Sequence, residues 1–181
     1  MNIKKIAVYA VAGILGIVVL ALGVGVFSPS GFQVTRSVVV AAPAESVFAY
    51  IANLPEWNQW SAWNDKKDPS LKYTYGGETG QVGSFMEWKS ELNGVGRVTI
   101  VELVPNSRLK YVMEMDGGKF HVDGSLTLNP VPEGTEVVWS DKGDMGNNPI
   151  FKFMGLFMDA MLGADFQEGL NNLKARAEAK K

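Results

Sequence analysis

The feature that most constrains this chain is an uncharged apolar segment close to its start. Residues 6–27 (IAVYAVAGILGIVVLALGVGVF) contain no charged side chain. A helix of about 20 such residues, rising about 1.5 Å per residue, crosses a hydrocarbon layer of about 30 Å. We therefore predict one transmembrane helix. A cleaved signal peptide is the alternative, but its apolar region normally spans only about 7–15 residues, and no A-x-A-like site precedes Ser28.

Charges on the two sides of this segment predict its orientation. Lys4 and Lys5 precede it, whereas the first charge after it is Arg36. By the positive-inside rule, the N-terminus lies in the cytoplasm and the rest of the chain lies outside, in the periplasm if the cell is Gram-negative. The predicted divisions are a cytoplasmic N-terminus at 1–5, an anchor at 6–27, a linker at 28–31 and one domain at 32–181.

Composition excludes several classes of function. The net charge is −2 and basic residues do not cluster beyond short pairs, so we expect no nucleic-acid binding. The chain has no cysteine and one histidine, His121, which leaves too few ligands for a typical zinc site. Four glycines at 76–83 match no phosphate-binding motif. No metal and no cofactor are therefore expected.

Local patterns predict a mixed α/β domain. Residues 32–40 are rich in β-branched residues and predict a strand, and two short helices follow Pro43. The second carries Trp57, Trp60 and Trp63 at a spacing of three, which we interpret as packing in or at the rim of the core. Alternating residues then predict further strands at about 71–76, 84–90, 97–104, 109–115, 120–128 and 136–141, joined by turns such as Asn93-Gly94 and Asp116-Gly117.

The last part of the chain is predicted to be one long helix. Asn148 and Pro149 suit its N-cap and first position. Its second half has an apolar stripe suited to packing on the sheet, whereas residues 150–162 are apolar over most of the circumference. Gly163 predicts a bend. The core stripe comprises Leu162, Phe166, Leu170, Leu173 and Ala177.

Four segments together resemble the SRPBCC superfamily, in its polyketide cyclase/dehydrase-like branch. They are APAESVFAYIANLPEWNQW at 42–60, GVGRVTIVELVPNSRL at 94–109, LTLNPVPEGTEVVW at 126–139 and GADFQEGLNNLKARAE at 163–178. The resemblance covers about residues 32–178. It implies an α+β helix-grip (START-like) fold, in which a curved antiparallel sheet of about six or seven strands wraps a long C-terminal helix. It also implies a cavity for lipids, sterols, polyketides or other apolar molecules.

The resemblance does not supply catalytic residues. Asn53 stands where relatives often carry Asp, and no catalytic motif of the family is present. Strand alternation predicts which side chains face the implied cavity; the alternative is that they fill a solid core. The predicted lining residues are Trp60, Met86, Trp88, Ile100, Tyr111, Met113, Met115, Phe120, Trp139, Met154, Phe157, Met158 and Met161.

Two carboxylates share the alternation of the cavity residues. Glu102 follows Ile100 by two positions and Asp141 follows Trp139, so either side chain is a candidate to orient a ligand hydroxyl from the cavity mouth. His121 alternates with the inward residues and is expected on the outer, solvated face of the sheet.

The preferred hypothesis is a membrane-anchored binding or carrier domain for a hydrophobic small molecule or a lipid. One alternative is a protein-interaction or membrane-surface docking module that uses the apolar helix 150–162. Another is a cyclase- or dehydratase-type enzyme in which Glu102 or Asp141 acts as acid or base. The sequence names neither the ligand nor a protein partner.

Overall fold

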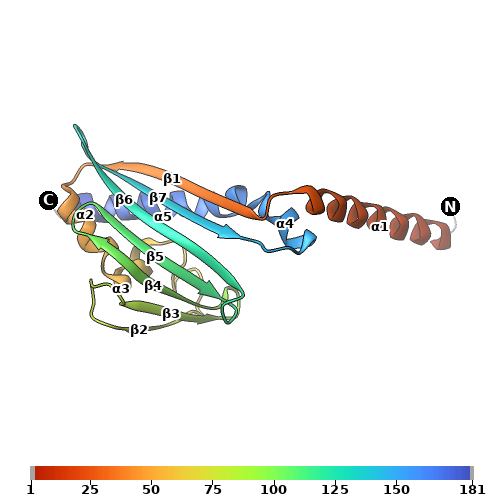
Figure 1. Cartoon of the computed structure of the whole chain (residues 1–181), viewed down its shortest axis with the longest axis horizontal. Helices are drawn as coiled ribbons and strands as arrows, with labels where there is room; N and C mark the ends of the chain where they lie inside the picture. The colour runs from red at the N-terminus through yellow and green to blue at the C-terminus, as the bar shows by residue number, and fades with distance from the viewer. Residues whose placement is uncertain (1–2, 180–181) are drawn as a thin grey trace.

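The computed structural model describes residues 3–179, apart from the side chains of residues 3, 4 and 7. Residues 1–2 and 180–181, which belong to the predicted cytoplasmic and C-terminal ends, lie outside the described residues. A long helix, α1 (Ile3–Phe27), projects from one end of a mixed α/β domain (Figure 1).

Helix α1 has the length and composition needed to cross a membrane. Its apolar part, Val8–Phe27, is 20 residues long and almost entirely exposed. An apolar helix of this kind near the N-terminus is typical of a membrane anchor or of a signal sequence.

The domain contains an antiparallel sheet of seven strands among the described residues, in the order β1-β7-β6-β5-β4-β3-β2. The α+β helix-grip architecture predicted above is confirmed. Three strands, β4, β6 and β7, run at least three residues longer than the sequence pattern indicated. The strands are β1 (Gly31–Val40), β2 (Lys72–Gly76), β3 (Phe85–Ser90), β4 (Gly94–Val104), β5 (Arg108–Met115), β6 (Phe120–Val131) and β7 (Gly134–Asp144).

Tight turns connect the central strands. In the turn between β5 and β6, Asp116 and Gly117 both have positive φ, at 51° and 68°. This backbone conformation is unfavourable for most residues but is tolerated by Asp and suits Gly. The prediction of a hairpin turn at this dipeptide is therefore confirmed.

Two short helices, α2 (Ala44–Ile51) and α3 (Leu54–Trp60), close the far end of the sheet as predicted. Trp57 and Trp60 are buried, with ring centroids 5.2 Å apart. Trp63 lies beyond α3, and its ring is 5.9 Å from Phe166. The interpretation of the three tryptophans as core packing is confirmed.

The long C-terminal helix is confirmed in α5, but the prediction that it runs unbroken from Pro149 and bends near Gly163 is wrong. The chain forms α4 (Pro149–Gly155) and α5 (Met158–Ala179), and the break lies at residues 156–157. Gly155, a poor helix former, is the last residue of α4. Gly163 instead lies within α5, where an added Cβ would be 1.8 Å from the Arg36 guanidinium. The predicted N-cap is confirmed, because the Asn148 side chain accepts a hydrogen bond from the Ile150 amide at 2.9 Å.

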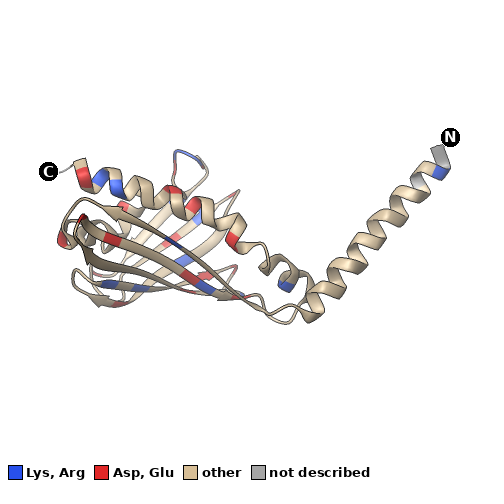
Figure 2. Cartoon of the chain, turned by 90° about the horizontal axis from the view of Figure 1, so that it is seen from above, with Lys and Arg blue, Asp and Glu red and all other residues tan. Residues whose placement is uncertain are grey.

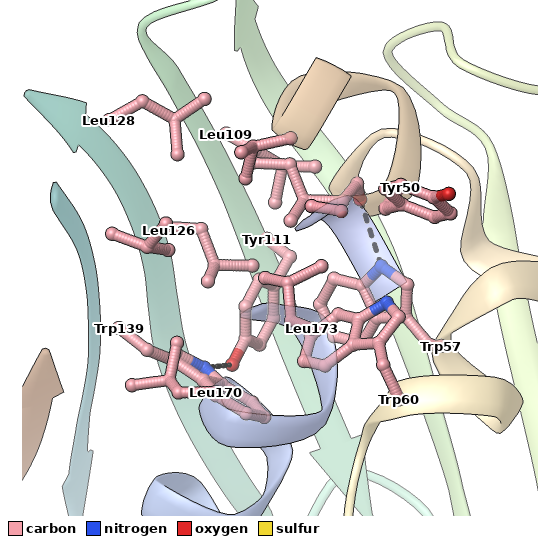
Figure 3. Close-up of a cluster of buried hydrophobic side chains, with 14 of the residues drawn as sticks. Tyr50, Trp57, Trp60, Leu109, Tyr111, Leu126, Leu128, Trp139, Leu170 and Leu173 are labelled. Atoms are coloured by element: carbon pink, nitrogen blue, oxygen red, sulfur yellow. Dashed lines mark hydrogen bonds between the residues drawn. The ribbon is translucent and has the colours of Figure 1, made fainter. Parts of the chain in front are cut away.

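Helix α5 packs against β1 and β7 and buries one face in the core (Figure 1). Phe166, Leu170 and Leu173 are at most 1% exposed. Figure 3 shows Leu170 and Leu173 pointing toward Leu126 and Trp139 of the sheet and toward the tryptophans of α3. Burial of an apolar side chain of this size is worth about 1.5–3 kcal/mol. This interface therefore holds helix and sheet together.

Candidate functional site

The inner face of the sheet has two unlike halves. Toward α2 and α3 the side chains are fully buried, as at Leu109, Leu126 and Val137. Toward the β3–β4 and β5–β6 turns, Met113, Met115 and Phe120 are only half-buried. We call this second region the hairpin end; α1 and α4 join the domain there (Figure 1). Apolar side chains that α5 leaves incompletely covered are available to a ligand.

A pocket of about 690 Å³ opens beside the hairpin end, largely between outward-facing side chains of β6 and β7. Its size is within the range of about 300–1,000 Å³ typical of small-molecule sites. Two aromatic rings stand in its wall, Phe120 from β6 and Phe151 from α4, at a centroid distance of 5.7 Å. The lining residues are Asp116, Lys119, Phe120, His121, Asp123, Lys142, Gly143, Asp144, Met145, Gly146 and Phe151.

A buried polar group lies on the inner face of the sheet, apart from the lining of this pocket. The Tyr111 hydroxyl donates a hydrogen bond to Asp141 Oδ1 at 2.5 Å and accepts one from Trp139 Nε1 at 2.9 Å. Tyr111, Gly124 and Asp141 face one another across β5, β6 and β7. An added Cβ on Gly124 would lie 2.0 Å from the Tyr111 ring. The bare backbone of Gly124 therefore lets the ring lie across β6 and reach Asp141.

Burial changes the acidity of this group. Removal from water raises the pKa of Asp141 to about 7, and the hydrogen bonds from Tyr111 and Trp139 offset only part of that rise. Burial, together with the neighbouring Asp141 charge, also raises the pKa of Tyr111. Asp141 is thus a carboxyl group that binds and releases a proton near neutral pH.

The predicted lining residues fall into three groups. Those enclosed in the core are Trp60, Met86, Ile100, Tyr111 and Trp139. Those half-buried at or near the hairpin end are Trp88, Met113, Met115, Phe120 and Met158. Those exposed on α4 and α5, or between them, are Met154, Phe157 and Met161. Of all these, Phe120 lines the 690 Å³ pocket. Met145 and Phe151 also line it, and sequence reasoning did not select them because they follow the last strand and belong to no alternating pattern.

The prediction that Glu102 shares the inward face of Ile100 is wrong. The register of β4 against β5 shifts between these residues, which marks a β-bulge. Because a bulge adds one residue, Glu102 turns to the outer face, opposite Lys110. There its carboxylate is 2.6 Å from Arg108 and 2.8 Å from Lys110. Hydrogen bonds from these two cations lower the pKa of Glu102.

The outer face also holds His121, which is exposed and 3.4 Å from Asp123, as expected from its place in the strand. Within the described part of the chain, no three His, Asp or Glu side chains are grouped so as to hold a metal ion.

The domain matches a known protein family over nearly its whole length. A family described as "Polyketide cyclase / dehydrase and lipid transport" matches residues 31–178, which is most of the chain and the whole described domain apart from its last residue. None of the curated proteins compared with the chain matches it significantly.

Several solved structures have the same fold. A protein from Nitrosospira multiformis is 25% identical, with a TM-score of 0.56 over 82% of this chain and 99% of its own. A protein from Chromobacterium violaceum is 20% identical, with a TM-score of 0.57 over 81% of this chain and 96% of its own. The di-domain ARO/CYC StfQ from the steffimycin biosynthetic pathway is 15% identical, with a TM-score of 0.63. That match covers 83% of this chain and 51% of StfQ.

Proposed function

The chain belongs to the polyketide cyclase/dehydrase and lipid transport family, and from this membership we propose that it is a membrane-anchored domain that binds a lipid or another hydrophobic small molecule. In this proposal α1 remains in the membrane with its N-terminus in the cytoplasm, and residues 32–181 lie on the opposite side. The ligand occupies the hairpin end, in the pocket whose wall includes Phe120, Met145 and Phe151.

The observation that carries the proposal is the contrast between the two halves of the inner face. The half near α3 is filled by rings in contact, such as Trp139 and Phe166 at 4.2 Å. The hairpin end keeps Met113 and Met115 half-buried on the inner face, and the 690 Å³ pocket opens at the same end of the sheet, around Phe120. Methionine side chains are flexible and polarisable, so they adapt to apolar ligands of varied shape.

Native mass spectrometry of the full chain, released from detergent micelles after purification from membranes, tests the proposal. We expect a discrete bound mass, which lipid extraction then assigns to a chemical class. A sample first stripped of lipid and then incubated with oleate, as a defined apolar probe, should regain a bound mass.

Paired variants locate the site. Met145→Trp adds bulk in the wall of the pocket, whereas Val82→Trp adds the same side chain in the β2–β3 loop, at the opposite end of the sheet, where Val82 is 58% exposed. The bound mass should be lost in Met145→Trp and kept in Val82→Trp. If the wild-type chain carries no bound mass, even after incubation with oleate, the binding proposal is wrong.

A second candidate function, acid–base catalysis of the cyclase or dehydratase type, is favoured by Asp141. A pKa of about 7 lets one carboxyl group both accept and donate a proton at neutral pH. The Tyr111 hydroxyl donates to that carboxyl on the inner face of the sheet, and Trp139 in turn donates to the Tyr111 hydroxyl.

The two functions are separable by substituting this residue. Asp141→Asn keeps the shape of the side chain and its hydrogen-bond acceptor but cannot ionise. If the wild-type chain releases the bound molecule in a chemically altered form and Asp141→Asn releases it unaltered, catalysis is supported. If both release the same unaltered molecule, the domain acts by binding alone.

A further inference from the structure

Helix α4 is packed directly against the end of α1. An added Cβ on Gly25 would lie 1.9 Å from the carbonyl oxygen of Pro149, so the two backbones touch at this glycine. Lys152 Nζ donates a hydrogen bond to the Val26 carbonyl at 3.0 Å, one of the last carbonyl groups of α1. The position of α4 is therefore fixed relative to the end of the apolar helix.

The segment that begins with α4 presents an apolar stripe to solvent. Four apolar side chains face solvent here: Ile150 and Met154 on α4, Phe157 in the break between the helices, and Met161 on α5. Their exposed fractions are 53%, 43%, 48% and 56%. The neighbouring side chains of Met158 and Leu162 point the other way and pack on the core. Core packing therefore does not account for the stripe, which we call the outward stripe.

Few charged residues are close in sequence to the outward stripe. Between Asp144 and Asp159 the only charged residue is Lys152. The carboxylate of Asp159 is held by Arg36 at 2.7 Å. Figure 2 shows acidic and basic residues distributed over the sheet and α5, whereas the part of α1 that adjoins α4 carries none.

We propose that the outward stripe lies in the membrane, at the boundary between lipid headgroups and acyl chains, beside the point where α1 leaves the bilayer. This inference rests on the proposed anchoring by α1. Twenty residues at about 1.5 Å each just span a hydrocarbon core of about 30 Å. Gly25 is two residues from the end of that span, so Pro149 lies within about 3 Å of the hydrocarbon boundary. Amphipathic helices at this depth bury their apolar face about 5–10 Å into the interface.

This placement gives the pocket a source of ligand. Phe151, which follows the first residue of the outward stripe, is one wall of the pocket. With the stripe in the interface, the pocket opens at the lipid surface, and an acyl chain enters it without crossing water. The ligand class favoured by this arrangement is a membrane lipid of the leaflet that α4 contacts.

The natural absence of cysteine makes the depth of each position measurable. Single cysteines are introduced at Phe157, Ile17 and Val104 of the full chain, labelled with the fluorophore NBD and placed in phosphatidylcholine nanodiscs. Ile17 lies in the middle of α1, and Val104 is an exposed residue next to the β4–β5 turn, at the opposite end of the sheet. Emission wavelength, quenching by aqueous iodide and quenching by spin-labelled lipids are recorded.

We expect Ile17→Cys and Phe157→Cys to emit at shorter wavelength than Val104→Cys, and lipids spin-labelled near the headgroup to quench position 157. If position 17 is in lipid but position 157 is quenched by iodide as strongly as position 104, the interface placement is wrong while the anchor stands. A label at 157 that neither quencher reaches indicates a second copy or another protein over the stripe and also overturns the placement. If the label at position 17 is exposed to water, α1 does not lie in the membrane, and both the anchor and the interface placement are wrong. Ligand content, measured on unlabelled chain, is independent of all these outcomes.

Discussion

The buried carboxyl group of Asp141 should make the free energy of unfolding fall as pH rises. In the unfolded chain Asp141 has its ordinary pKa of 3.8, whereas in the folded domain burial raises the pKa to about 7. Below pH 3.8 the group is protonated in both states. Between these pKa values the unfolded state releases the proton first and is favoured, and above about pH 7 the folded domain carries the full penalty of a buried charge.

The size of this penalty follows from the two pKa values. At 1.36 kcal/mol per pKa unit, the difference corresponds to about 4 kcal/mol. A change of 1 kcal/mol moves the melting temperature of a domain of this size by about 2–4 °C, so the expected effect is about 8–16 °C. Asp141→Asn stays neutral at every pH and can still accept the Tyr111 hydrogen bond. It should match the wild type near pH 4 and exceed its stability by up to about 4 kcal/mol at pH 8.5.

Thermal melting of the full chain in detergent micelles, followed by tryptophan fluorescence, measures this difference between pH 4 and 8.5. Other carboxylates titrate equally in both proteins, so the comparison isolates Asp141. Glu102→Gln is a control in which stability should depend on pH in the opposite direction. Hydrogen-bonded ion pairs lower the pKa of Glu102. The stabilisation by Glu102 is therefore present above the ordinary pKa of this group and is lost as pH falls through the lowered pKa. A stability difference between Asp141→Asn and wild type that does not change with pH would refute the reasoning.

Three further substitutions test the packing around this group and around α5. Tyr111→Phe removes the hydroxyl that donates to the Asp141 carboxylate and should cost about 1–3 kcal/mol in the free energy of unfolding at pH 8, measured by urea titration. Gly124→Ala places a methyl group against the Tyr111 ring and should cost about 1–3 kcal/mol, seen as a lower melting temperature. Gly163→Ala places a methyl group against the Arg36 guanidinium and should destabilise the wild type. In an Arg36→Ala background the same substitution should stabilise the domain by about 1 kcal/mol. Additive effects of the two substitutions in a double-mutant cycle would contradict this contact.

Sequence patterns predicted the elements whose signals are local. Alternation in the fifth and sixth strands correctly placed Tyr111 inside and His121 outside, because a regular antiparallel ladder keeps a period of two. The same argument failed at Glu102, since the bulge after Ile100 adds one residue without a turn signal in the sequence.

Features that depend on distant contacts were outside the reach of sequence reasoning. In the sequence, Gly163 predicts a locally weakened helix. In the structure, the missing side chain of Gly163 makes room for the Arg36 guanidinium of β1 against α5. Gly124 reads as an ordinary strand glycine, although its role is to seat the Tyr111 ring. The pocket wall at Met145 comes from a loop that only the folded chain brings next to α4.

The linker between α1 and β1 is short and is held by hydrogen bonds. Residues 28–30 are held at both ends: Ser28 Oγ donates to the Val24 carbonyl at 2.9 Å, and the Ser30 carbonyl accepts from the Met145 amide at 2.8 Å. Even fully extended, three residues span only about 10 Å. With α1 in a membrane, the domain therefore stays at the surface of that membrane and cannot move between two bilayers. Any transfer of a bound molecule to another compartment then requires an acceptor that travels to this domain.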